Sequence, residues 1–92
     1  MKTIQRRDKL KIYGDLLNAL SIETDPEKIV LSRIQLRTNL PFDRLKEYIS
    51  DMIELGFVQD ETSLVVTEKG REYLAEYEKI LGFMKRMGLS YL

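Results

Sequence analysis

The sequence contains neither cysteine nor histidine. The absence of cysteine excludes disulfides and thiolate zinc sites, and the absence of histidine removes the most common general base. A metal ion would have to be held by carboxylates alone, and no acidic cluster has the spacing of a metal-binding loop. No nucleophile and base can be paired from the remaining residues. We therefore expect no enzymatic activity, no metal and no cofactor.

Long apolar runs and net charge are missing as well. No run approaches the ~20 apolar residues of a membrane span, and the N-terminal segment lacks the apolar stretch of a signal peptide. An intracellular, cytoplasmic protein without a membrane partner is therefore expected. The 92 residues carry 15 basic and 15 acidic side chains, whereas proteins that coat DNA without sequence preference are usually basic.

The charges are unevenly distributed along the chain. Residues 1–50 hold ten Lys or Arg and seven Asp or Glu, whereas residues 51–92 hold five and eight. The basic excess lies over the N-terminal arm and the helices expected before residue 50. Ordinary scatter of surface charge is the alternative explanation.

Apolar periodicity and capping residues predict helices separated by turns and one hairpin. The expected elements are helices at 7–22, 32–38, 41–55 and 67–87, and strands at 57–59 and 64–66. Ser32 and Gln35 fit a capping box at the start of the second helix. Asn39 suits the left-handed conformation of a tight turn, and Gly56 suits a Schellman ending. Ile29–Leu31, which begins with two β-branched residues, could pair with the hairpin as a short strand.

This order of elements is that of a winged helix-turn-helix, a mostly α fold with a small β-hairpin. We expect residues 1–67 to form this domain and residues 68–92 to form a C-terminal dimerisation helix. The apolar residues of that helix recur at heptad spacing, and one further leucine widens the stripe. The expected interface residues are Tyr73, Tyr77, Ile80, Leu81, Met84, Met87 and Tyr91. The alternatives are a helix folded back on its own core, or a tyrosine platform for single-stranded nucleic acid.

Several short segments also resemble a known family. They are Arg33-Ile34, Asn39-Leu40, Tyr48-Ile49, Leu55, Thr67-Glu68-Lys69-Gly70 and the opening RRDKLKIYGDLLNAL. Together they resemble the small archaeal winged-helix DNA-binding proteins, which include the Sulfolobus chromatin-type dimers and predicted archaeal transcriptional regulators. The resemblance covers about residues 6–85.

This resemblance implies a homodimer joined by an antiparallel coiled coil of the last helices, with two winged-helix heads on duplex DNA. The chain departs from the family in two respects. Pro41 stands where members often have serine, which is structurally harmless. The chain is neutral where several members are basic, which favours a regulator with few sites over a protein that coats DNA.

The helix predicted at 41–55 should present its outer face to base edges in the major groove. Its outward residues are Phe42, Asp43, Arg44, Lys46, Glu47 and Ser50. Arg44 is the best candidate reader because a guanidinium can bond guanine O6 and N7 together. Lys46 could read a base or hold a phosphate, and a carboxylate could accept from a cytosine amine. The alternative is a solvent-facing surface of salt bridges.

Phosphate contacts are expected from the second helix and from the N-terminal arm. Arg37 and Thr38 lie at the end of the second helix, and the arm contributes Arg6, Arg7 and Lys9. Arg33 lies at a helix start, where the helix dipole disfavours a cation, so it should have a tertiary partner or a phosphate unless it is simply exposed. The hairpin turn offers no cation, and Asp60 and Glu61 would repel DNA unless they point away.

The expected function is that of a homodimeric, sequence-specific transcriptional regulator that binds double-stranded DNA. It would lie in the cytoplasm with the nucleoid, and the sequence indicates no small-molecule ligand. The alternative function is a winged helix used only for protein–protein contact, because fold alone does not settle function.

Overall fold

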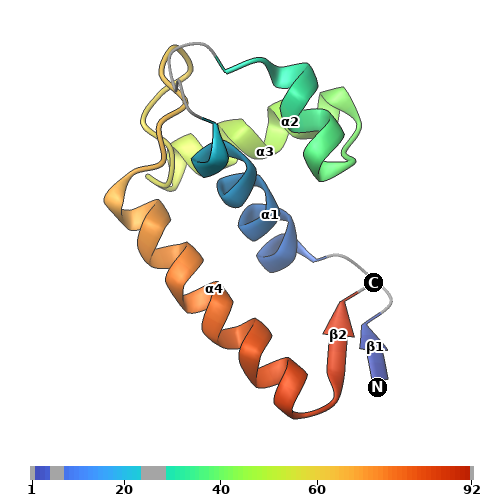
Figure 1. The fold of residues 1–92 in the computed structure, drawn as a ribbon. Coiled ribbons are helices and arrows are strands. Elements are labelled where there is room, and N and C mark those ends of the chain that lie inside the picture. The colour runs from blue at the N-terminus through green and yellow to red at the C-terminus, as the bar shows by residue number, and fades with distance from the viewer. Residues whose placement is uncertain (1, 5–7, 24–28, 92) are drawn as a thin grey trace.

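The structure of the protein, a computed structural model, describes residues 2–4, 8–23 and 29–91 (Figure 1). Its elements, in chain order, are β1 (Lys2–Ile4), α1 (Lys9–Ile22), α2 (Leu31–Thr38), α3 (Phe42–Glu54), α4 (Glu68–Arg86) and β2 (Leu89–Tyr91). The four helices follow the predicted order. None of the described helices has the length and apolarity needed to cross a bilayer.

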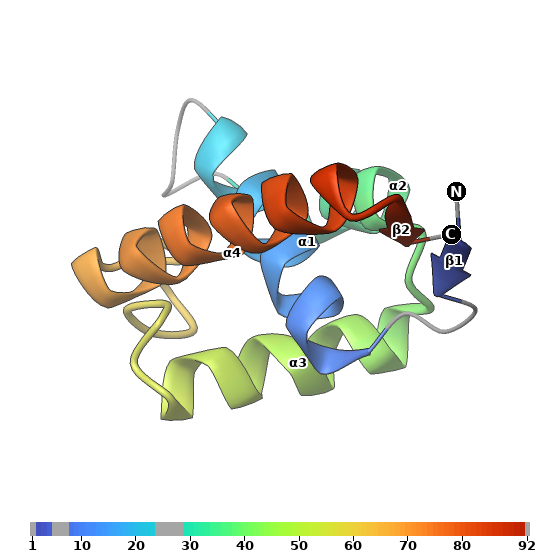
Figure 2. The ribbon, with the colours of Figure 1, turned by 90° about the horizontal axis from the view of Figure 1, so that it is seen from below.

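Helix α1 is the centre of the fold and lies between α3 and α4 (Figure 2). Most of its apolar residues are buried, and Leu16 and Leu17 have 0% relative exposure. The helix begins at Lys9, two residues later than the predicted start at Arg7. The reason is that the Asp8 side chain accepts a hydrogen bond from the Lys11 amide (3.0 Å) and so caps the helix.

The turn between α2 and α3 and the end of α3 follow the prediction. Asn39 has φ of 55°, in the left-handed region, and its amide donates to the Gln35 carbonyl. Gly56 has φ of 85° and follows the last turn of α3. Its amide donates to Ile53 O (3.0 Å), and the next amide, of Phe57, donates to Met52 O (2.8 Å). These two bonds form the expected Schellman motif.

Two predictions near α2 are wrong. The helix begins at Leu31 with Val30 as its N-cap, and no side chain caps it. Ser32 therefore lies inside the first turn, because the amides of Arg33 and Ile34 already bond to the Val30 carbonyl (3.0 and 3.3 Å). Ile29–Leu31 is not a strand either, since Leu31 is helical and neither preceding residue is in a strand.

The predicted hairpin is present in a reduced form, which we call the wing (residues 57–67). Its two predicted strands are reduced to a single antiparallel bridge between Val58 and Val66. Three backbone bonds close it, from the Gln59 amide to Val65 O (3.0 Å), from the Asp60 amide to Ser63 O (3.3 Å) and from the Thr67 amide to Phe57 O (2.9 Å).

The segment Thr67–Gly70 fastens α4 to the wing and to the end of α3. The Thr67 hydroxyl accepts from the Gly70 amide (3.1 Å) and donates to Gly56 O (2.6 Å). The Lys69 ammonium donates to Leu55 O (2.7 Å), at the carbonyl end of α3. A Cβ on Gly70 would overlap the Phe57 carbonyl, so only glycine allows this close approach.

The C-terminal helix packs against its own chain over much of its length. Tyr77 and Met84 are buried, and the Tyr73 hydroxyl donates to Leu10 O (2.7 Å) in the first turn of α1. Beyond α4, β2 pairs in parallel with β1 at the other end of the chain (Figure 1). Tyr91 therefore lies in a strand, and its predicted place on a helical seam is wrong.

Candidate nucleic-acid interface

The outward surface of α3 divides into two flanks and a ridge. The first flank holds Arg44, Tyr48 and Asp51 at helical spacings of four and three. It faces α1, because the Tyr48 ring lies 6.1 Å from the Tyr13 ring and the Tyr13 hydroxyl donates to Asp51 Oδ2 (3.3 Å). Burial, followed by the nearby Asp51 carboxylate, raises the pKa of Tyr13 above its usual value. Arg44 itself is exposed.

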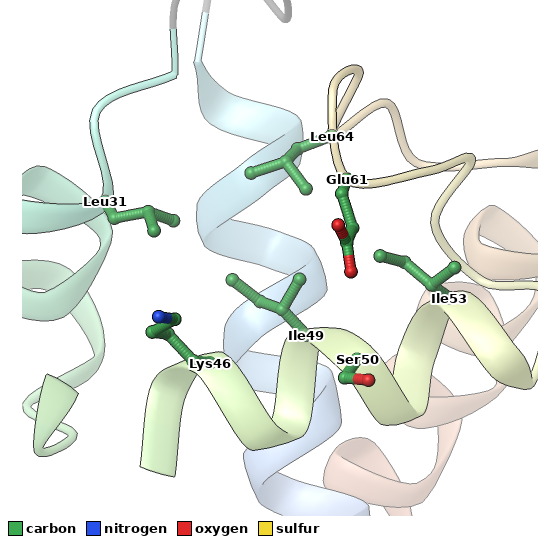
Figure 3. Close-up of a pocket in the computed structure, with 7 residues that line it drawn as sticks. All are labelled: Leu31, Lys46, Ile49, Ser50, Ile53, Glu61 and Leu64. Atoms are coloured by element: carbon green, nitrogen blue, oxygen red, sulfur yellow. The ribbon is translucent and has the colours of Figure 1, made fainter. Parts of the chain in front are cut away.

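The second flank faces the wing and forms one side of a hollow, which we call the wing-side groove (Figure 3). The groove has a volume of about 330 Å³. Its aliphatic surface is formed by Leu31, Ile49, Ile53 and Leu64. Its polar residues are Lys46 and Ser50 from α3 and Glu61 from the wing.

Arg44 and Lys46 therefore point to opposite sides of the helix. Two helical positions correspond to a rotation of about 200°, and the two residues belong to different flanks. Both are exposed, as predicted, but on different flanks. A helix in the major groove would place one of them on each side of its line of contact.

The ridge between the two flanks is acidic. Asp43, Glu47, Ser50 and Glu54 are all exposed and recur at spacings of four, three and four, and Ser50 also borders the wing-side groove. The ridge is the part of α3 farthest from the core, so a groove-bound helix would bring it nearest to the bases. Carboxylates at this place repel phosphates and can accept hydrogen bonds only from donors such as the cytosine amine.

Phe42 positions the lysine of the wing-side flank. The Lys46 ammonium lies 5.6 Å from the centre of the Phe42 ring, one turn earlier on α3. Phe42 is 45% exposed, so its ring gives the cation a partly solvated aromatic support. The exposed part of the ring also offers an apolar surface of the kind that contacts a thymine methyl group.

The two arginines of α2 share one acidic partner. Arg33 Nη1 lies 3.2 Å from Glu23 Oε2, and Arg37 Nε lies 3.8 Å from Glu23 Oε1. Glu23 follows α1 directly, and its side chain is only 8% exposed. The expected tertiary partner of Arg33 is thus present. Because both guanidinium groups are about half exposed, each retains hydrogen-bond donors that face solvent.

The remaining predicted phosphate contacts have different outcomes. Thr38 is buried and donates its hydroxyl to Ile34 O (2.8 Å), so its predicted contact with DNA is wrong. Lys9 is exposed in the first turn of α1. Arg6 and Arg7 lie outside the described residues.

The wing turn is organised by Asp60. Its carboxylate Oδ1 accepts from the amides of Thr62 (2.9 Å) and Ser63 (2.7 Å) and from the Thr62 hydroxyl (2.8 Å). These bonds, led by the one from the hydroxyl, lower the pKa of Asp60. One wing carboxylate is therefore engaged within the turn, whereas Glu61 faces the wing-side groove (Figure 3).

Comparison with known families agrees with this geometry. A family model described as winged helix-turn-helix matches residues 6–85. The chain belongs to this winged helix-turn-helix family. Such domains are in general DNA-binding regulators and are typically not enzymes. No curated protein and no solved structure matched the chain.

Sequence reasoning missed two features of this winged helix. Glu23 lies just beyond the predicted end of the first helix, and no local pattern links it to arginines ten and fourteen residues later. The wing-side groove was missed because its residues come from α2, α3 and the wing. Among the residues that line it, only Lys46 and Ser50 could be singled out from the sequence, as outward positions on α3.

Proposed function

We propose that this winged helix is a sequence-specific regulator that binds double-stranded DNA with α3 in the major groove. The observation that supports the proposal best is the exposed surface of α3 after the Asn39 turn. This surface carries a cation on each flank, Arg44 and Lys46, and is accessible over the whole length of the helix. Phe42, Glu47 and Ser50 complete the proposed contact surface.

The acidic ridge argues for selective rather than general DNA binding. Non-specific affinity comes from the neutralisation of phosphates, and the carboxylates of Asp43, Glu47 and Glu54 oppose it. The same carboxylates can be satisfied where cytosine amines line the groove. We therefore expect weak binding to mixed sequence and a preference for sites with cytosine opposite the ridge.

The proposal is tested by selecting bound duplexes from a random pool and measuring the affinity of the preferred duplex by fluorescence anisotropy. Arg44→Ala and Lys46→Ala should each weaken binding by about 5- to 150-fold if the lost contact reads a base. Lys79→Ala is the matched control, because Lys79 is an exposed α4 lysine in an i,i+3 pair with Glu76. If no sequence is enriched, or if all three variants bind equally, the proposed role of α3 fails and the protein-contact alternative replaces it.

We further propose that the functional unit is a homodimer joined along α4 in an antiparallel coiled coil. Several residues of the predicted seam pack within the chain, but a second stripe of α4 remains accessible. Ile80, Phe83 and Met87 recur at spacings of three and four, and the last two are 51% and 58% exposed. Leu81, 38% exposed, lies on the opposite flank of the helix.

Solution mass decides the dimer proposal separately from DNA binding. Phe83→Glu combined with Met87→Glu should give monomers by light scattering at concentrations where the unmodified protein is a dimer, because both carboxylates would be buried without partners. Arg71→Glu with Glu78→Lys is the control and should leave the mass unchanged, because both residues are exposed on the side of α4 away from this stripe. A monomeric unmodified protein would refute the proposal.

A further inference from the structure

The wing-side groove combines an aliphatic floor with two opposite charges. Leu31, Ile49, Ile53 and Leu64 converge on it from three different elements (Figure 3). Ile49 and Leu64 are more than nine-tenths buried, so the floor is continuous with the hydrophobic core. A surface of this kind is unsuited to phosphates and is typical of sites that hold an apolar group.

Neither charge of the groove has an oppositely charged partner within the described part of the chain. Lys46 and Glu61 form no ion pair with each other, and the Glu61 side chain has no other ion-pair or hydrogen-bond partner among the described residues. The Lys46 ammonium contacts the face of Phe42 instead. The groove thus presents a cation from α3 and a carboxylate from the wing, with aliphatic surface beside them.

The size of the groove limits what it can hold. Its α3 residues run from Lys46 to Ile53, which is two helical turns or about 10 Å. Its volume of about 330 Å³ lies at the lower end of the range for small-molecule sites. An amphipathic helix needs apolar anchors over a longer surface. A groove of this size and charge fits a small molecule that has one apolar side chain, one positive group and one negative group.

We propose that the wing-side groove binds an apolar α-amino acid of the size of leucine or phenylalanine. The carboxylate of the ligand pairs with Lys46 and its ammonium pairs with Glu61. Its side chain covers Ile49, Ile53 and Leu64, and the Ser50 hydroxyl offers one further hydrogen bond beside the charged groups. The ligand satisfies both charges at once, which neither a simple fatty acid nor a simple amine can do.

Ligand binding would then compete with DNA at Lys46. This consequence rests on the proposed function, since Lys46 belongs to the surface of α3 that is proposed to contact the duplex. A bound carboxylate occupies the ammonium and adds a negative charge beside it. Saturating ligand should therefore weaken DNA binding, and DNA should weaken ligand binding by the same factor.

The binding step is tested without DNA, so its failure is distinguishable from a failure of DNA binding. The ¹⁵N-labelled protein is titrated with L-leucine while amide shifts are followed by NMR. Two truncated probes are titrated in parallel, 4-methylpentanoate, which lacks the amine, and isopentylamine, which lacks the carboxylate. We expect saturable shifts at Lys46, Ser50 and Glu61 with L-leucine and at least about tenfold weaker binding of both truncated probes, as for loss of a charge-assisted hydrogen bond.

Two variants test whether Lys46 and Glu61 pair with the charged groups of the ligand. Lys46→Met and Glu61→Gln should each weaken L-leucine binding by a similar factor. The exposed α4 residues Lys79 and Glu72 provide controls, and Lys79→Met and Glu72→Gln should leave binding unchanged. Absence of saturable shifts at millimolar L-leucine and L-phenylalanine would overturn the proposal. Equal binding of 4-methylpentanoate, or unchanged binding by Glu61→Gln, would overturn it as well.

Discussion

The crossing of α1 and α4 gives a sharp test of the packing, because Gly14 and Tyr77 meet there. Gly14 lies in the middle of α1 and is buried. A Cβ at this position would lie 2.5 Å from Tyr77 Cδ2 and 2.9 Å from Cζ. The ring cannot easily move aside, because Tyr77 is only 5% exposed and lies 6.4 Å from the Tyr73 ring.

Replacing Gly14 by alanine therefore has two opposing effects on the free energy of unfolding. The higher helix propensity of alanine should add about 1 kcal/mol, whereas overpacking a filled core costs about 1–3 kcal/mol. The added methyl group would lie between the α1 backbone and the Tyr77 ring, and neither can shift far to remove the overlap. We therefore expect a net loss of about 1 kcal/mol in the free energy of unfolding. Such a loss lowers Tm by about 4–8 °C in a domain of this size.

Gly82→Ala is the matched control. Gly82 lies in the middle of α4, where the nearest atom to an added Cβ is Arg86 Nη1 at 3.5 Å, the end of a flexible side chain. This variant gains helix propensity without a clash, and its Tm should rise by about 4–8 °C.

Both variants are compared by urea denaturation and thermal circular dichroism at one protein concentration, since association would make Tm depend on concentration. Gly14→Ala should also lower the free energy of unfolding by a smaller amount in a Tyr77→Leu background, where the ring is absent. If Gly14→Ala stabilises the protein as much as Gly82→Ala, the close approach of α1 and α4 is refuted.

Two predictions concern the wing and its junction with α4. Thr67→Ala should lower the free energy of unfolding by about 1–2 kcal/mol in urea titrations, because it removes an N-cap and the bond to Gly56; retention of full stability would contradict this role. The pKa of Asp60 is lowered in the fold, so its contribution is present above the unfolded value of 3.8 and is lost as pH falls through the folded pKa. Asp60→Asn keeps an acceptor oxygen but cannot titrate, so the Thr62 amide shift should move with pH below about 4 in the unmodified protein and stay constant in the variant.

The parts of the fold that could be predicted from the sequence are those set by local chemistry. Asn39 and Gly56 mark their turns because few residues adopt positive φ, and Thr67 caps α4 by a bond within four residues. The apolar residues of α1 could also be predicted to face the core, because their spacing follows the period of a helix. Ser32 shows the limit, because a capping pattern does not fix which residue begins the helix.

The parts that could not be predicted depend on contacts between distant residues. Heptad spacing grouped the apolar residues of α4 on one seam, but spacing does not say which side of a wide stripe packs on α1. The structure separates the predicted residues into an inner side that includes Tyr77 and an accessible side that includes Met87. The pairing of β1 with β2 joins the two ends of the chain, and neither segment carries a strong strand pattern by itself.

The arginines of α2 show how the structure changes the expected balance of contacts with DNA. Arg37 borders a hollow with Asn18 and Ile22 of α1, whereas Leu31, on the opposite flank of α2, faces the wing-side groove. Glu23 lies beside both guanidinium groups, so the ion pairs of this cluster join the end of α1 to α2. We therefore expect the double change of Arg33 and Arg37 to glutamine to lower stability while leaving the salt dependence of DNA binding unchanged.

Contacts to two phosphates would instead reduce the slope of log K against log salt by about 1.8. Anisotropy titrations of the preferred duplex between about 50 and 200 mM salt separate the two outcomes, with Lys46→Ala as a comparison from the proposed DNA surface. A reduced slope in the double variant would return these arginines to the DNA surface. Glu23 would then hold the two guanidinium groups in place while their exposed donors bind the phosphates.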